Sequence, residues 1–94
     1  MKILIIDDER SIRNSLKEIL EDEGYDVDVA EHGQQGVEMV EKEKYDVIFC
    51  DIKMPVMDGV EALKKLVSMG IDSAVVMISG HADITTAVDC IKRG

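Results

Sequence analysis

The chain has 94 residues, which is enough for one small domain and excludes a second folded unit of ordinary size. Hydrophobic residues make up 46% of the sequence, but its only aromatic residues are two tyrosines and one phenylalanine, so aliphatic side chains and methionines must fill the core. The formal net charge of −9 argues against direct binding of nucleic acid or of an anionic membrane, because phosphate contacts need a basic surface.

The amino-terminal part of the chain predicts a strand, a helix and a second strand. Residues 2–6 are a short apolar run of the kind found in strands that are buried on both faces. This run is too short for a signal peptide or a membrane span, so we expect a cytoplasmic protein. Residues 11–23 carry apolar side chains at helical spacing, and Gly24 stands where a C-terminal cap is expected. Residues 25–30 alternate apolar and polar, which predicts a strand at the edge of a sheet.

The rest of the chain continues the same alternation. Residues 33–43 have a weaker helical pattern, residues 45–50 form another apolar strand-like run, and Gly59 opens a helix that Gly70 ends. Residues 74–79 predict a fourth strand, and a last helix follows it. Strands that alternate with helices of about ten residues pair in parallel through right-handed crossovers. The sequence therefore predicts an α/β fold with an open, doubly wound parallel sheet.

Polar residues stand directly after three of the four predicted strands. Asp7 and Asp8 follow the first strand, Asp51 follows the third, and the Ser-Gly-His turn at residues 79–81 follows the fourth. Because the carboxyl ends of parallel strands meet at one edge of a sheet, these residues should lie close together. Carboxylates held together repel one another, and a divalent cation relieves the repulsion. The oxygen donors suit Mg²⁺ with several retained waters.

Helix capping is the simplest alternative explanation for these acids. Asp8 or Glu9 could favour the dipole of the helix at residues 11–23, and for Asp8 alone this explanation is as good as cation binding. Capping does not explain why three acids should converge at strand ends. The cation site is therefore the better hypothesis for the group as a whole.

Together these motifs resemble the receiver domain of bacterial two-component response regulators over essentially the whole chain. The resemblance rests on the Asp7-Asp8 pair, on the DIKMPVMDG segment at residues 51–59 and on the turn at residues 79–81, all in the family's order and spacing. It implies a flavodoxin-like fold with the strand order 2-1-3-4. His81 follows the Ser-Gly pair, and in this the chain resembles many receivers that are attached to enhancer-binding transcription activators. This resemblance suggests that subfamily.

The resemblance implies a role for each site residue. Asp51 is expected to accept a phosphoryl group from a histidine kinase, a phosphotransfer protein or a small phosphodonor such as acetyl phosphate. Asp8, Asp51 and the backbone carbonyl of Lys53 are expected to bind Mg²⁺ directly, and Asp7 is expected to bind it through a water. The hydroxyl of Ser79 is expected to hydrogen-bond the phosphoryl group. Such a domain is a phosphorylation-controlled switch for an output domain, for example in transcription, rather than an enzyme, because its only chemistry is its own phosphorylation and dephosphorylation.

The chain departs from the family at its carboxyl-terminal end. A complete receiver has five strands and five helices, and its fifth strand carries a lysine that pairs with the phosphoryl group. We therefore interpret residues 1–94 as one receiver domain that is truncated at this end and lacks the fifth strand and fifth helix. The missing lysine predicts impaired phosphorylation with Mg²⁺ binding retained. The uncovered fourth strand and last helix predict self-association by strand exchange or edge pairing.

Two other functions stay open on the sequence alone. One is a Mg²⁺-dependent phosphohydrolase with Asp51 as its nucleophile, since such enzymes also place an aspartate after a buried strand. They usually carry a second aspartate two residues later, where this chain has Lys53. The other is a phosphorylation-independent interaction module with a vestigial acidic site.

Overall fold

The computed structural model describes residues 1–51 and 59–78 of the chain. Strands and helices alternate in this part of the chain, and every predicted element within it is present, with ends that differ from the prediction by at most two residues. The predicted last helix lies outside the described residues. The elements are β1 (Lys2–Ile6), α1 (Arg10–Asp22), β2 (Asp26–Ala30), α2 (Gly33–Lys42), β3 (Val47–Asp51), α3 (Gly59–Ser68) and β4 (Ala74–Ile78).

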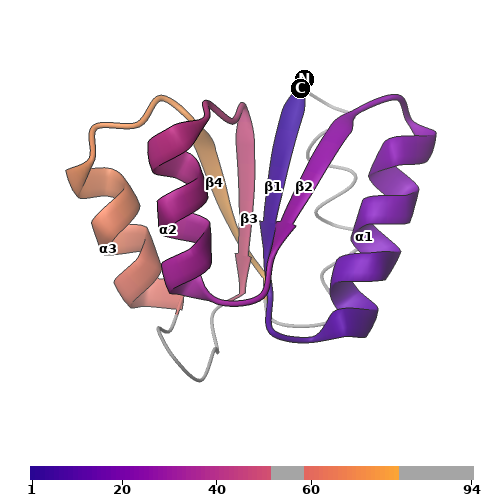
Figure 1. Ribbon diagram of the computed structural model, residues 1–94, viewed down its shortest axis with the longest axis horizontal. Coiled ribbons are helices and arrows are strands. Elements are labelled where there is room, and N and C mark those ends of the chain that lie inside the picture. Colours follow the sequence, from indigo (N-terminus) through magenta and orange to yellow (C-terminus); the bar gives the residue numbers. More distant parts are fainter. Residues whose placement is uncertain (52–58, 79–94) are drawn as a thin grey trace.

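The four strands form one parallel sheet with the order β2-β1-β3-β4. Helix α1 covers one face of this sheet, and α2 and α3 cover the other (Figure 1). This is the predicted doubly wound arrangement, and the predicted edge position of β2 is confirmed. In the described residues β4 is the opposite edge strand, and self-association through it stays a prediction.

Strand β1 supplies side chains to two separate apolar clusters, one on each face of the sheet. Leu4 and Ile6 pack on the side of α2 and α3, whereas Ile3 and Ile5 pack on the side of α1. All four side chains are fully buried, and each contributes about 1.5–3 kcal/mol by leaving water. A strand without a solvent face needs this continuous apolar composition. The other buried members of the cluster on the α1 side are Ile12, Leu16, Leu20, Val27, Phe49 and Ile78.

Helix α1 packs on the sheet through a narrow apolar stripe. Ile12, Leu16 and Leu20 recur every four residues and are buried. The chain then turns at Gly24, whose φ of 91° is in the left-handed region that favours glycine. The amide of Gly24 donates to the carbonyl of Glu21 at 2.9 Å. This hydrogen bond satisfies a carbonyl of the last turn and aims the chain into β2, as the sequence predicts.

Helix α2 begins with an unusual cap and lies very close to β1. The Nδ1 atom of His32 accepts a hydrogen bond from the amide of Gln35 at 3.2 Å, and Oε1 of Gln35 accepts one from the amide of Glu31 at 2.8 Å. One turn later Gly36 faces the sheet, where a Cβ atom would lie 2.4 Å from Cδ1 of Ile6. The absence of a side chain at Gly36 therefore lets α2 pack directly over the end of β1.

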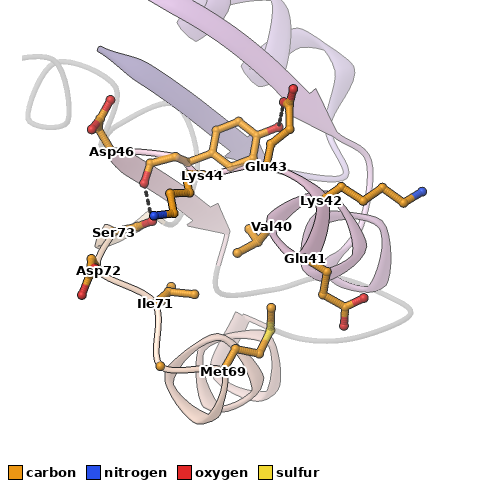
Figure 2. A pocket seen from close by; sticks show the side chains of 12 residues that line it. Val40, Glu41, Lys42, Glu43, Lys44, Asp46, Met69, Ile71, Asp72 and Ser73 are labelled. Atoms are coloured by element: carbon orange, nitrogen blue, oxygen red, sulfur yellow. Dashed lines mark hydrogen bonds between the residues drawn. The ribbon is translucent and has the colours of Figure 1, made fainter.

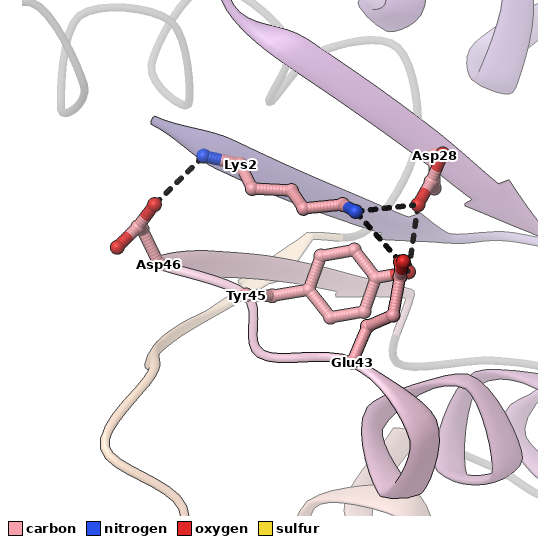
Figure 3. A network of polar contacts seen from close by, with 5 residues as sticks. All are labelled: Lys2, Asp28, Glu43, Tyr45 and Asp46. Carbon is pink, nitrogen blue, oxygen red and sulfur yellow. Dashed lines mark hydrogen bonds and ion pairs between the residues drawn. The ribbon is translucent and has the colours of Figure 1, made fainter.

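A polar network joins the amino-terminal ends of the strands (Figure 3). Nζ of Lys2 lies 2.7 Å from Glu43 and 3.9 Å from Asp28, and the backbone amide of Lys2 donates to Asp46 at 2.7 Å. The hydroxyl of Tyr45 lies 2.8 Å from Asp28 and 3.3 Å from Glu43. The hydrogen bond to Glu43 raises the pKa of Lys2. Burial raises the pKa of Tyr45, and its hydrogen bond to Asp28 adds to the effect.

We predict that Gly36→Ala destabilises the fold. Alanine gains about 1 kcal/mol of helix propensity, but overpacking a tight contact costs about 1–3 kcal/mol, so we expect a net loss of about 1 kcal/mol in urea unfolding. Ile6→Val removes Cδ1, the nearer of the two Ile6 atoms that would lie under 3 Å from the new methyl group, and costs about 1 kcal/mol on its own. If the contact is the cause, the double variant loses less stability than the two single variants together. Strictly additive losses would contradict this explanation.

We also predict that the network loses stability at alkaline pH. Both Lys2 and Tyr45 have raised pKa values in the fold, so their contribution is complete below the ordinary pKa of about 10 and declines as the pH rises through the folded values. Tyr45→Phe should cost about 1 kcal/mol at neutral pH and should reduce the alkaline loss, measured by urea unfolding across a pH series. Tyr25→Phe, outside the network, is the control and should keep the slope of the parent chain.

Candidate metal centre

Two neighbouring strands bring three carboxylates to the carboxyl-terminal edge of the sheet. Ile6 pairs with Cys50 across β1 and β3, so Asp7 and Asp51 follow side by side. Asp7, Asp8 and Asp51 each place a carboxylate oxygen within 4.8 Å of the others. The structure thus brings together the three acids expected to converge from the sequence. The predicted positions of Lys53 and Ser79 lie outside the described residues.

The three carboxylates have different surroundings. Asp7 is 0% exposed and Asp51 is 7% exposed, whereas Asp8 is exposed to solvent. Oδ1 of Asp7 accepts a hydrogen bond from the amide of Glu9 at 2.8 Å, but Oδ2 is buried without a hydrogen-bond partner. Burial raises the pKa of Asp7, the Glu9 amide opposes this shift, and the negative charges of Asp8 and Glu9 add to it. Asp7 is thus an acid whose charged form the fold disfavours.

This donor set fits a hard divalent cation. A buried polar atom without a partner costs about 1–3 kcal/mol, and more when it is charged. A cation beside Oδ2 of Asp7 would remove this cost and would also offset the repulsion among the three acids. Carboxylate oxygens are the ligands that Mg²⁺ prefers over nitrogen or sulfur. The residues present therefore match the chemistry that the sequence predicts for this edge.

Cys50, which immediately precedes Asp51, takes no part in this chemistry. Its thiol is free and buried in the cluster on the side of α2 and α3. Burial, together with the negative charges of Asp51 and Asp7, raises the pKa of Cys50 to about 12. A thiol that stays protonated is a poor nucleophile and a poor metal ligand. The reactive groups in the described part of this edge are therefore carboxylates.

Arg13 lies beside the acids and was not identified by the sequence analysis. Its Nη1 donates to the backbone carbonyl of Asp7 at 2.9 Å, and its Nη2 lies 3.8 Å from Oε1 of Glu31. The side chain is only 12% exposed. The feature of the sequence that could have identified Arg13 is its place next to buried Ile12 near the start of α1. This feature is weak, because basic residues on amphipathic helices are usually solvated.

A hollow of about 760 Å³ lies at the other end of the sheet (Figure 2). It lies between the end of α2 and the segment that links α3 to β4, with Val40, Met69 and Ile71 among its apolar lining. In doubly wound sheets ligands bind beyond the carboxyl ends of the strands, whereas this hollow is at their amino ends. The acids rather than the hollow therefore mark the candidate site.

Comparison with known proteins identifies the family. The response regulator receiver domain family matches residues 3–94. The chain belongs to this family. Receiver domains are regulatory domains that act as phosphorylation-controlled signalling switches, and the acids at the end of β1 and β3 occupy the positions on which the resemblance rested. Among the described residues, no helix combines the length and apolar character needed to cross a lipid bilayer.

Relatives and solved structures agree with this assignment. The chain is 35% identical over 92 residues to the transcriptional regulatory protein ZraR of Klebsiella oxytoca, covering 98% of this chain and 21% of that protein. It is 33% identical over 94 residues to the response regulator MprA of Mycobacterium leprae, covering 100% of this chain and 41% of that protein. The chain thus spans between about a fifth and two fifths of the length of these relatives.

Two solved structures confirm the receiver fold. The response regulator TrrA from Thermotoga maritima, solved in complex with Mg²⁺-BeF, superposes with a TM-score of 0.86 at 25% identity, covering 98% of this chain and 96% of that chain. The receiver domain of the Francisella response regulator 1452 superposes with a TM-score of 0.79 at 31% identity, covering 99% of this chain and 77% of that chain.

We predict that Asp7→Asn stabilises the fold in the absence of divalent cations. Because the pKa of Asp7 is raised in the fold, the cost of its charge appears as the pH rises above the ordinary pKa of about 3.9, is complete above the folded pKa, and vanishes in acid. The variant should gain about 1 kcal/mol in urea unfolding at pH 7 with EDTA, and little at about pH 4. Exposed Asp72 provides a control of equal charge change, and Asp72→Asn should leave stability within about 0.5 kcal/mol. Equal gains from both variants would point to net charge instead.

Proposed function

We propose that this chain is a phosphorylation-controlled switch in which Asp51 accepts a phosphoryl group in a Mg²⁺-dependent reaction. The observation that carries the proposal is the convergence of three carboxylates at the carboxyl ends of β1 and β3 in a member of the receiver family. The donor would be a histidine kinase, a phosphotransfer protein or a small molecule such as acetyl phosphate. The chemistry would be self-directed, with no separate product released.

Each acid has its own part in this proposal. Asp8, Asp51 and the carbonyl of Lys53 would hold Mg²⁺ directly, and Asp7 would act through a water. When bound, Mg²⁺ offsets negative charge on the phosphoryl oxygens. A carboxylate oxygen of Asp51 forms the new bond to phosphorus while the bond from phosphorus to the donor breaks, and the donor leaves with that electron pair. Asp51 is 7% exposed at the sheet edge, which suits transfer away from bulk water.

The partners follow from the same proposal. We propose that the domain acts in the cytoplasm. Ser79 would hydrogen-bond the phosphoryl group, and a change in the domain surface would then regulate an output domain. One relative is a transcriptional regulatory protein, which supports a transcriptional output. The enhancer-binding subfamily, impaired phosphorylation and self-association stay predictions. The phosphohydrolase alternative is disfavoured by lysine at position 53, and the interaction-module alternative predicts no acyl phosphate.

The test is labelling of the chain with acetyl phosphate, measured by intact mass. We expect one added phosphoryl group in the presence of Mg²⁺, formed slowly if phosphorylation is impaired as predicted, none with EDTA, and none in Asp51→Asn. Asp8→Asn, which removes a ligand but keeps the acceptor, should need more Mg²⁺ for the same labelling. Labelling that persists in Asp51→Asn would contradict the assignment of the acceptor.

A second measurement separates binding from chemistry. TrrA was solved with Mg²⁺-BeF, and beryllium fluoride can be added to this chain as a non-reacting phosphoryl analogue. If it raises the unfolding temperature of the parent chain only in the presence of Mg²⁺, the site binds a phosphoryl-like group. A chain that binds the analogue but is not labelled would have a functional site with impaired transfer. A chain that does neither would favour the interaction-module alternative.

A further inference from the structure

The Asp7 residue is fixed by hydrogen bonds at three of its four polar atoms. Its amide donates to the carbonyl of Ala30 at 3.1 Å, and its Oδ1 accepts from the amide of Glu9 at 2.8 Å. Its carbonyl accepts from Nη1 of Arg13 at 2.9 Å. Of these four atoms only Oδ2 has no hydrogen-bond partner, and it belongs to the carboxylate that Asp7 contributes to the group with Asp8 and Asp51.

The hydrogen bond from Arg13 acts on Asp8 as well. The carbonyl of Asp7 belongs to the peptide that joins Asp7 to Asp8, and a peptide is planar. Fixing this oxygen therefore fixes the plane from which the Asp8 backbone departs. Asp8 is exposed to solvent, so we expect its direction to depend on this peptide.

Arginine suits this role better than another cation. Its planar guanidinium carries several donors in a rigid fork, which can serve two acceptors at once. Here one nitrogen bonds Asp7 after β1 and another lies 3.8 Å from Glu31 after β2. A lysine at this position has a single charged nitrogen and cannot reproduce the fork.

We propose that Arg13 is a positioning residue for the cation site, holding the Asp7–Asp8 peptide so that both carboxylates face the bound metal. The inference rests on the proposed function, because it concerns the same Mg²⁺ site. For removal of Arg13, this role predicts a change in Mg²⁺ affinity opposite in sign to the change that simple electrostatics predicts. A positive charge near the acids repels a cation, so its removal should tighten Mg²⁺ binding, whereas loss of a positioning group should weaken binding.

The test compares Mg²⁺ affinity of the parent chain with that of Arg13→Met and Arg13→Lys by isothermal titration calorimetry. Methionine keeps an apolar stem but removes both charge and donors, and we expect binding about 10-fold weaker, the low end for loss of an outer-shell partner. Lysine keeps the charge but not the fork, and we expect an intermediate loss. Arg10→Met is the matched control, since Arg10 is exposed on the first turn of α1, and its loss should leave binding unchanged or tighter.

Labelling with acetyl phosphate at increasing Mg²⁺ gives a readout that a merely structural role would not move. Positioning predicts that Arg13→Met needs more Mg²⁺ for half-maximal labelling but approaches the parent rate at saturation. If the parent chain binds Mg²⁺ and Arg13→Met binds it equally well or more tightly, the inference is overturned and the proposed function stays intact. A parent chain that binds no Mg²⁺ would overturn both. If Arg13→Met fails to fold, Arg13→Lys decides, and parent-like affinity in that variant would overturn the inference.

Discussion

The parallel pairing of β1 with β3 is the constraint on which the rest of the structure depends. It sets Ile6 opposite Cys50, and therefore Asp7 beside Asp51 at the point where both strands end. This position is unfavourable for the charged form of both acids, because each loses contact with water and gains a like-charged neighbour. The register is nevertheless specified, because a slip of one residue would exchange the side chains of β1 between the two apolar clusters and would move Ile6 away from Gly36. The aliphatic core thus imposes the acidic cluster.

The two ends of the sheet differ in the surroundings of their carboxylates. At the amino-terminal end Lys2 and Tyr45 lie among three carboxylates, and each of these carboxylates has a hydrogen-bond or ion-pair partner (Figure 3). At the carboxyl-terminal end acids meet acids, and a buried oxygen of Asp7 has no hydrogen-bond partner. The acids of the polar network, which have matched partners, therefore lie away from the site. A local conflict of this kind is expected where function competes with folding.

Much of this arrangement can be predicted from the sequence, because it follows from periodicity. The apolar runs, the stripe of α1 and the glycine after it specify strands, helices and a turn, and alternation of the two specifies a doubly wound sheet. The convergence of Asp7, Asp8 and Asp51 follows from the sheet. The difference between buried Asp7 and exposed Asp8 does not, because strand alternation ends at Ile6 and the turn after it has its own geometry.

Contacts made by long side chains are the part that the sequence does not reveal. The cap at His32 depends on which ring nitrogen meets the amide of Gln35, and the fork of Arg13 depends on a carbonyl six residues earlier in the chain. These contacts depend on how α1 and α2 dock on the sheet, which no local pattern encodes. Arg13 also shows why they matter for the site. Every neighbour that fixes Asp7 acts on its backbone or on Oδ1, so the remaining oxygen is held in place without being neutralised. An oxygen held in this way is costly to the fold on its own and well placed for a cation, so binding of a cation there would be linked to folding stability.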